Sequence, residues 1–169
     1  MPTIRIAIAG ATGYTGEELL RLLLQHPHVQ VTYLAASAKW ERPVAVSDVF
    51  PRLTRPLDLC VEALDSNTLS DRSDAVFLAL PHGGAMTLVP SLLSAGKRVI
   101  DLSGDFRLQD PALYPQWYHM PHAHPELLRE AGTVYGLTEW CRQRIPSARL
   151  LSNPGCYATS ILLGVLPLF

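Results

Sequence analysis

Charge imbalance and long apolar runs are both missing from this sequence. Its 14 basic and 15 acidic residues leave a net charge of −1, so no electrostatic argument favours nucleic acid or a membrane surface. The longest apolar stretch, 161–169, is too short to span a bilayer and is interrupted by Gly164 and Pro167. Nothing before Ile4 resembles a signal peptide. We therefore expect neither a membrane nor a nucleic-acid partner.

Cysteine is scarce as well. Cys60, Cys141 and Cys156 are odd in number, and no two of them have C-x-x-C spacing. This usage is typical of reduced thiols in a cytoplasmic protein. A free cysteine is usually an inert buried residue, and we expect this of Cys60 and Cys141.

The amino-terminal stretch shows a strand, a glycine turn and a helix in succession. Apolar residues over 4–9 predict a buried parallel strand, and leucines over 17–24 have helical spacing. Between them, Gly10, Gly13 and Gly16 recur every three residues, a variant of the commoner G-x-G-x-x-G pattern. With 169 residues, of which 48% are apolar, the chain can form one core and the beginning of a second unit.

This turn is suited to a dinucleotide. One glycine allows the tight turn, one lets the backbone approach a pyrophosphate, and one lets helix and strand pack closely. The phosphates would lie on unpaired N–H groups at the helix start. The turn residues expected to bind the cofactor are Gly10, Thr12, Gly13, Tyr14, Thr15 and Gly16. The alternative is a glycine-rich turn that binds nothing.

The end of the second predicted strand, 29–34, indicates which cofactor is bound. An NAD-binding domain places an acidic residue there, on the adenosine ribose, and none occurs over 35–39. Ser37 and Lys39 instead offer a hydroxyl group and a positive charge that suit a 2′-phosphate. We therefore expect NADP(H) in preference to NAD. The alternative is a solvated loop that happens to contain a lysine.

Further segments alternate between strand-like and helix-like patterns. Strands are expected over 29–34, 57–63, 75–80, 98–102, 133–136 and 148–152. Helices are expected over 85–95 and 138–145, with another beginning at Asp110-Pro111. This alternation predicts an α/β fold with a Rossmann-like, doubly wound, mostly parallel sheet.

Two strand ends carry further candidate residues, at the edge where α/β sheets bind ligands. Pro81, His82 and Gly83 follow one strand, and we favour a backbone that lines the cofactor, although His82 could simply cap the next helix. The segment 103–107 follows another strand, and the guanidinium group of Arg107 can hold a phosphate or carboxylate through two parallel N–H···O hydrogen bonds. The alternative is a structural pairing of Arg107 with a nearby aspartate, Asp101 or Asp105.

Three histidines, His119, His122 and His124, lie close together in an irregular segment. No cysteine or carboxylate completes a ligand set with metal-like spacing, so we expect no metal site. A lid or a substrate-facing loop is the favoured interpretation.

Cys156 is the candidate nucleophile. Pro154-Gly155 forces a turn between a strand and a helix, so Cys156 falls at the helix N-terminus. The positive end of a helix dipole favours a thiolate and can stabilise an oxyanion.

Five motifs in order resemble one enzyme family. They are Gly-Ala-Thr-Gly-Tyr-Thr-Gly-Glu-Glu-Leu at 10–19, Phe-Leu-Ala-Leu-Pro-His-Gly at 77–83, Val-Ile-Asp-Leu-Ser-Gly-Asp-Phe-Arg-Leu at 99–108, Tyr-Gly-Leu-Thr-Glu at 135–139 and Ser-Asn-Pro-Gly-Cys-Tyr-Ala-Thr at 152–159. Together they resemble the N-acetyl-γ-glutamyl-phosphate reductases of arginine biosynthesis, within the semialdehyde dehydrogenase superfamily.

The resemblance implies a mechanism. Cys156 would attack the acyl phosphate of a small-molecule substrate and expel phosphate, and NADPH would reduce the resulting thioester to the semialdehyde. Residues 81–83 would lie on the nicotinamide side of the cofactor. Arg107, Ser103 and Asn153 would lie on the substrate side.

The resemblance also implies a domain division. Residues 1–153 would form the NADP-binding domain, and 154–169 the nucleophile turn and first helix of a second α/β domain. In this family that domain supplies a catalytic histidine, substrate contacts and the interface of a homo-oligomer. We therefore expect the chain to be an incomplete fragment with a truncated second domain, and to be inactive alone.

Other functions stay open. A lysine-biosynthesis reductase, whose acyl phosphate is held by a small carrier protein, has nearly the same motifs. Aspartate-semialdehyde dehydrogenase has a similar overall organisation, although different residues usually flank its nucleophilic cysteine. A non-catalytic NADP-binding module would share the fold but not the reactive thiol.

Overall fold

The computed structural model describes residues 3–53, 57–129 and 132–169. Its strands are β1 (Ile4–Ala9), β2 (Val29–Ala35), β3 (Val44–Ala45), β4 (Cys60–Glu62), β5 (Ala75–Leu78), β6 (Arg98–Asp101), β7 (Thr133–Tyr135) and β8 (Leu150–Ser152). They form one sheet in the order β3-β4-β2-β1-β5-β6-β8-β7. Every neighbouring pair is parallel except β3 with β4.

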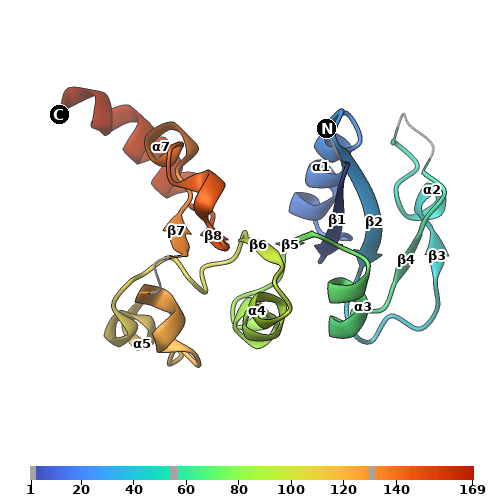
Figure 1. Cartoon of the computed structure of the whole chain (residues 1–169), viewed down its shortest axis with the longest axis horizontal. Helices are drawn as coiled ribbons and strands as arrows, with labels where there is room; N and C mark the ends of the chain where they lie inside the picture. The colour runs from blue at the N-terminus through green and yellow to red at the C-terminus, as the bar shows by residue number, and fades with distance from the viewer. Residues whose placement is uncertain (1–2, 54–56, 130–131) are drawn as a thin grey trace.

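Helices lie on both sides of the sheet, with α3, α4 and α5 below the row of strands in Figure 1 and α1 and α7 above it. The α-helices are α1 (Tyr14–Leu23), α2 (Val46–Val49), α3 (Ser66–Asp71), α4 (Gly84–Ser94), α5 (Tyr114–Tyr118), α6 (Thr138–Cys141) and α7 (Cys156–Val165). Short 3-10 helices are η1 (Pro111–Leu113), η2 (Pro125–Arg129), η3 (Ile145–Ser147) and η4 (Leu166–Leu168).

The alternation of side chains along β1 divides the core in two. Ala7 and Ala9 belong to the cluster that packs against α4, whereas Ile6 and Ile8 belong to the cluster that includes Leu20 of α1. Two apolar layers on opposite faces of a parallel sheet define a doubly wound α/β fold. The predicted fold class is therefore confirmed.

The predicted elements are confirmed with shifted boundaries. The first helix begins at Tyr14, three residues before the predicted start, so Gly16 lies inside its first turn. The helix predicted over 138–145 is only the short α6, because a 3-10 turn containing Pro146 follows it. The short helix α3 was not predicted, although Asp65 caps it by accepting from Thr68 N–H at 2.7 Å.

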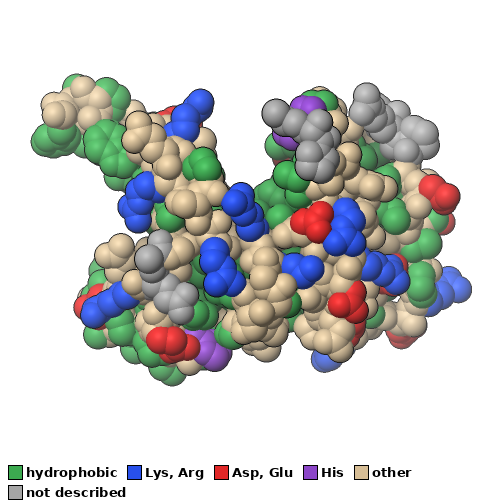
Figure 2. Space-filling view, in the orientation of Figure 1, with side chains coloured by type: hydrophobic (Ala, Val, Ile, Leu, Met, Phe, Trp, Pro, Cys, Tyr) green, Lys and Arg blue, Asp and Glu red, His purple; other side chains and the backbone are tan. Residues whose placement is uncertain are grey.

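Helix α7 stands out from the sheet at one end of the molecule, with the C-terminus at its tip (Figures 1 and 2). None of its residues is buried, and the apolar side chains of Tyr157 and Ile161 are 84% and 64% exposed. Within the described residues, no helix is long and apolar enough to cross a membrane. The division into two domains at residue 153 stays a prediction.

Candidate active site

The parallel strands bring the predicted site segments to one edge of the sheet. β1, β2, β5, β6 and β8 are neighbours and run parallel, so their carboxyl ends lie together. The glycine turn follows β1, and the segments 37–39, 81–83, 103–107 and 153–156 follow the other four. Because β5 and β6 separate β1 from β8, the ends of β1 and β8 are three strand spacings apart, about 14 Å. A ligand that contacts both must be extended and must pass over the ends of β5 and β6.

Two of the three glycines are required by packing within the protein. Gly10 has a φ of +84°, and a Cβ atom there would lie 2.2 Å from the carbonyl oxygen of Ala79. A Cβ atom on Gly16 would lie 2.4 Å from the carbonyl oxygen of Gly10. These glycines therefore allow the turn, α1 and the end of β5 to pack closely.

Gly13 is different, because the protein itself leaves room for a side chain there. Its φ is −81°, and among the described residues other than its chain neighbours an added Cβ would meet only the Gly10 carbonyl oxygen, at 3.7 Å. Gly13 is also the N-cap of α1, and it provides no side-chain acceptor. Among the described residues, nothing accepts from the N–H groups of Thr12, Tyr14 or Thr15, all of which are exposed. The open space and these free donors fit a pyrophosphate at the helix start.

Ser37 and Lys39 lie beside this turn. The N–H groups of Gly10 and Ala11 both donate to the carbonyl oxygen of Ala35, at 2.9 Å each, and hold the end of β2 against the turn. Ser37 and Lys39 follow directly and are exposed. The backbone segment that carries this hydroxyl group and this lysine therefore starts at the glycine turn, and their contact with a ligand stays a prediction.

The loop after β5 is held by the loop after β6. Pro81 and His82 are exposed at the sheet edge. His82 Nδ1 accepts from Gly104 N–H at 3.0 Å, and its ring packs edge-on against Tyr118 with centroids 5.1 Å apart. The alternative in which His82 caps α4 is wrong, because its imidazole bonds to the loop after β6 instead.

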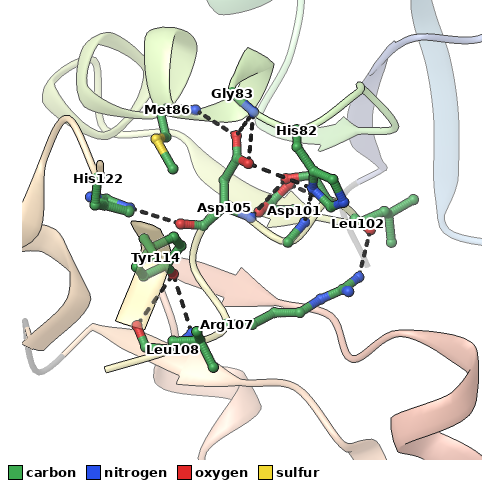
Figure 3. A network of polar contacts seen from close by, with 12 residues as sticks. His82, Gly83, Met86, Asp101, Leu102, Asp105, Arg107, Leu108, Tyr114 and His122 are labelled. Atoms are coloured by element: carbon green, nitrogen blue, oxygen red, sulfur yellow. Dashed lines mark hydrogen bonds and ion pairs between the residues drawn. The ribbon is translucent and has the colours of Figure 1, made fainter. Parts of the chain in front are cut away.

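Asp105 supplies the cap of α4 (Figure 3). Its carboxylate accepts from Gly83 N–H at 2.8 and 3.0 Å and from Met86 N–H at 3.1 Å. The side chain is buried, and the Asp105 N–H donates to Ser103 Oγ at 3.1 Å. Sequence patterns did not reveal this role, because the partners are about 20 residues apart in the chain.

Main-chain carbonyl groups hold Arg107. Its Nε donates to the carbonyl oxygen of Asn153 and its Nη2 to that of Leu102, each at 2.9 Å. Among the described residues, no ion pair joins Arg107 to Asp101 or Asp105, so the alternative of a structural pairing with either aspartate is wrong. Arg107 therefore keeps its charge available for a ligand.

A cavity of about 700 Å³ brings Arg107 and Cys156 together. Its lining consists of Arg107, Leu108, Gln109, Tyr118, Tyr135, Gly155, Cys156, Tyr157, Ala158 and Leu162. A Cβ atom on Gly155 would lie 2.9 Å from Arg107 Nη1, so the guanidinium group rests against the turn that precedes the thiol. Cys156 is the first residue of α7 and is exposed. An anion in this cavity can therefore meet both groups.

Ser103 and Asn153 are not among the residues that line this cavity. Ser103 is buried, and its N–H donates to Asp101 Oδ1 at 2.9 Å. The side-chain amide of Asn153 donates to the carbonyl oxygen of Pro154 at 3.2 Å. Their contact with a substrate stays a prediction.

Two tyrosines that were not predicted as site residues also line the cavity. Tyr118 ends α5, directly before the histidine-containing segment expected to face the substrate, and Tyr135 ends β7 at the same sheet edge. Burial raises the pKa of the Tyr135 hydroxyl. The available signal was the run of aromatic residues Tyr114, Trp117 and Tyr118 just before the three histidines, since large rings next to an anion site shape its walls.

The three histidines have separate environments. His122 is buried, with its Nε2 donating to the Asp105 carbonyl oxygen at 2.7 Å and its Nδ1 accepting from His124 N–H at 3.0 Å. Burial lowers the pKa of His122, which favours this neutral form. His124 Nδ1 lies 3.2 Å from Glu126 Oε1. Across the described parts of the chain, no group of three or more His, Cys, Asp or Glu side chains is arranged to hold a metal ion.

The expectation that Cys60 is buried is wrong. Along β4 the side chains alternate, so Val61 points into the core and Cys60 points to solvent. Cys141 is partly buried. The structure therefore holds two exposed thiols, Cys60 and Cys156, in different surroundings.

Comparison with known proteins identifies the family. The family described as "Semialdehyde dehydrogenase, NAD binding domain" matches residues 5–148. Proteins named N-acetyl-gamma-glutamyl-phosphate reductase match 98% of the chain, that of Nitrosococcus oceani at 52% identity and that of Bordetella pertussis at 50%. The chain spans 47% and 45% of those two proteins, which is about half of their length.

Solved structures share the fold. Aspartate semialdehyde dehydrogenase II from Vibrio cholerae superimposes with a TM-score of 0.67 at 18% identity, covering 98% of this chain and 42% of that one. The Candida albicans aspartate semialdehyde dehydrogenase, solved with NADP, gives a TM-score of 0.65 at 17% identity, covering 98% of this chain and 46% of that one. At these identities the likeness concerns the fold alone.

Proposed function

The chain belongs to the semialdehyde dehydrogenase family, and we propose that it is the cofactor-binding and nucleophile-bearing part of an NADP-dependent acyl-phosphate reductase. The family match makes the domain a binder of a nicotinamide dinucleotide. The substrate that we propose is N-acetyl-γ-glutamyl phosphate, because relatives that bear this substrate's name are about 50% identical over 98% of the chain.

We propose NADP(H) rather than NAD as the cofactor. The N–H groups at the start of α1 would hold the pyrophosphate, and Gly13 would give it room. Ser37 and Lys39, exposed next to the turn, would hold the 2′-phosphate of the adenosine ribose. A bound reduced nicotinamide supplies the hydride that converts a thioester to an aldehyde.

The thiol of Cys156 performs the covalent step. Its sulfur, as the thiolate, attacks the acyl carbon, the bond from that carbon to the phosphate oxygen breaks, and phosphate leaves with the electron pair. The free N–H groups at the start of α7 stabilise the negative charge on sulfur and on the carbonyl oxygen. Phosphate needs no proton to leave, so this step requires no acid near the thiol.

Arg107 binds the anion next to the thiol. Two of its nitrogens donate to main-chain carbonyl groups, which fixes the guanidinium plane, while Nη1 lies against Gly155. A guanidinium group held in this way can bind a phosphate or carboxylate without first losing side-chain entropy. The carbonyl oxygens of Leu102 and Asn153 thus orient the arginine for its ligand.

The observation that carries the proposal is the shared cavity of Cys156 and Arg107 at the carboxyl edge of the sheet. The test is competitive alkylation of the native chain with iodoacetamide, followed by mass spectrometry of each cysteine. Cys60 is the matched control, because it is also exposed but lies in a strand, not at a helix N-terminus, and no arginine-lined cavity surrounds it among the described residues.

We expect Cys156 to react at least about tenfold faster than Cys60, because the N–H groups at the start of α7 and the Arg107 guanidinium group in the same cavity stabilise negative charge on the attacking sulfur. An acyl phosphate should protect Cys156 and leave Cys60 unaffected. Equal rates without protection would contradict the reductase and leave a non-catalytic nucleotide-binding module.

A further inference from the structure

The Asp105 carboxylate holds together two loops at the carboxyl edge of the sheet. It is 1% exposed, and it belongs to the loop after β6, whereas the N–H groups that it accepts from belong to the start of α4, after β5. The N-cap of α4, Gly83, has a φ of +88° and no side chain to cap the helix itself. The start of α4 therefore depends on a charged group about 20 residues away in sequence.

The segment that contains Asp105 also reaches the nucleophile turn. Two residues further on, Arg107 donates to the carbonyl oxygen of Asn153, three residues before Cys156. In Figure 3 the Asp105 carboxylate points up toward Gly83 and Met86, while the Arg107 side chain lies lower in the view and extends sideways toward Leu102. One short loop thus fixes the 81–83 loop and the turn before the thiol relative to each other.

The path of the ligand makes this connection important. If the phosphates lie on the glycine turn after β1 and the redox end reaches Cys156 after β8, the part between them passes over the ends of β5 and β6. The residues at the end of β5 are Pro81, His82 and Gly83. The adenosine part lies on the other side of β1, next to Ser37 and Lys39.

We propose that Asp105 is a positioning residue, which fixes the 81–83 loop so that it supports the nicotinamide half of the bound dinucleotide. The proposal rests on the proposed function, because it assumes a dinucleotide on the glycine turn. Asp105 touches neither ligand nor thiol and acts through the backbone of Gly83 and Met86. His82, whose Nδ1 lies 3.8 Å from Asp105 Oδ1, is part of the same arrangement.

The test compares two ligands that share the adenosine half. NADPH and adenosine 2′,5′-bisphosphate are titrated against the wild-type chain and Asp105→Asn, by fluorescence and calorimetry respectively. Asparagine keeps the shape but has no charge. Because both carboxylate oxygens accept from Gly83 N–H, the amide NH2 group of asparagine, itself a donor, would face Gly83 N–H in either orientation. We expect the Kd for NADPH to rise about tenfold and the Kd for the bisphosphate to stay unchanged.

Asp110→Asn is the matched control. Asp110 also caps a helical turn, accepting from Ala112 N–H at 3.0 Å, but it is exposed and does not contact the 81–83 loop. Its substitution should leave both affinities unchanged. If Asp105→Asn fails to fold, Asp105→Glu replaces it, because the longer side chain keeps the charge but displaces the carboxylate from Gly83, and the same selective loss is expected.

Two outcomes would overturn the role of Asp105. Either both ligands bind the variant as they bind the wild type, or both lose affinity equally, as expected for general destabilisation. Failure of the wild-type chain to bind either ligand would instead contradict the proposed function. The two failures are therefore distinguishable.

Discussion

Replacing Asp101 with asparagine should stabilise the protein at alkaline pH. Asp101 ends β6 and is fully buried, with Oδ1 accepting from Ser103 N–H at 2.9 Å. Its Oδ2 is buried without a hydrogen-bond partner among the described residues, and so is Ser152 Oγ, opposite it on β8. Burial raises the pKa of Asp101 to about 6, so its ionisation in the folded state is costly at pH 8.

The sign and size of the effect follow from linkage. A carboxyl group whose folded-state pKa lies above its unfolded value of 3.8 destabilises the protein as pH rises, with the full loss reached above pH 6. A shift of about two units corresponds to about 3 kcal/mol at pH 8 and to about half of that at pH 5. The uncharged Asp101→Asn variant avoids this loss, and Ser152 Oγ is available as an acceptor for its amide.

Urea unfolding of both proteins, followed by circular dichroism from pH 5 to pH 8, measures the difference. Every other carboxyl group is common to the two chains, so its titration cancels in the comparison. We expect the advantage of the variant in unfolding free energy to grow with pH toward about 3 kcal/mol. A difference that is independent of pH, or a variant that is less stable at pH 8, would refute the reasoning.

Three further predictions concern the cofactor turn and the core. Gly10→Ala should lower the unfolding free energy by at least about 2 kcal/mol in urea titrations, because the φ of Gly10 is +84° and the added carbon meets Ala79. Gly13→Ala should leave the unfolding free energy unchanged and weaken NADPH binding by about tenfold or more, because the added carbon occupies the space proposed for the pyrophosphate. Equal stability losses at the two glycines would contradict this assignment. Lys39→Ala should weaken NADPH binding, measured by fluorescence, and leave NADH binding unchanged, and a parallel loss of both would argue against a 2′-phosphate site. Tyr114→Phe should lower the unfolding free energy by about 1–2 kcal/mol in thermal unfolding, because the buried hydroxyl accepts from Leu108 N–H and donates to the Leu108 carbonyl oxygen. An unchanged melting temperature would contradict this prediction and would show that water replaces the hydroxyl.

Features encoded by neighbouring residues were predictable from the sequence. The glycine turn, the parallel strands and the place of Cys156 at a helix start all follow from short local patterns. Proline and glycine before Cys156 limit the backbone so strongly that the structure has helix α7 begin at the predicted residue.

Features that depend on distant partners were not predictable. The cap of α4 by Asp105 joins segments about 20 residues apart, and the carbonyl groups that orient Arg107 belong to main chain that has no sequence signature. The exposure of Cys60 depended on the register of β4, where one residue decides which face a side chain occupies. Composition alone could not supply that register.

The central claim is that the Cys156 sulfur is an acyl acceptor in an arginine-lined cavity. Intact-mass and peptide mass spectrometry of the chain after mixing with N-acetyl-γ-glutamyl phosphate tests it most directly, with phosphate release measured in parallel. The account predicts one acyl group per chain, on Cys156, one phosphate released for each, and neither in Cys156→Ser. Acylation that is absent, or that occurs equally on Cys60, would contradict it.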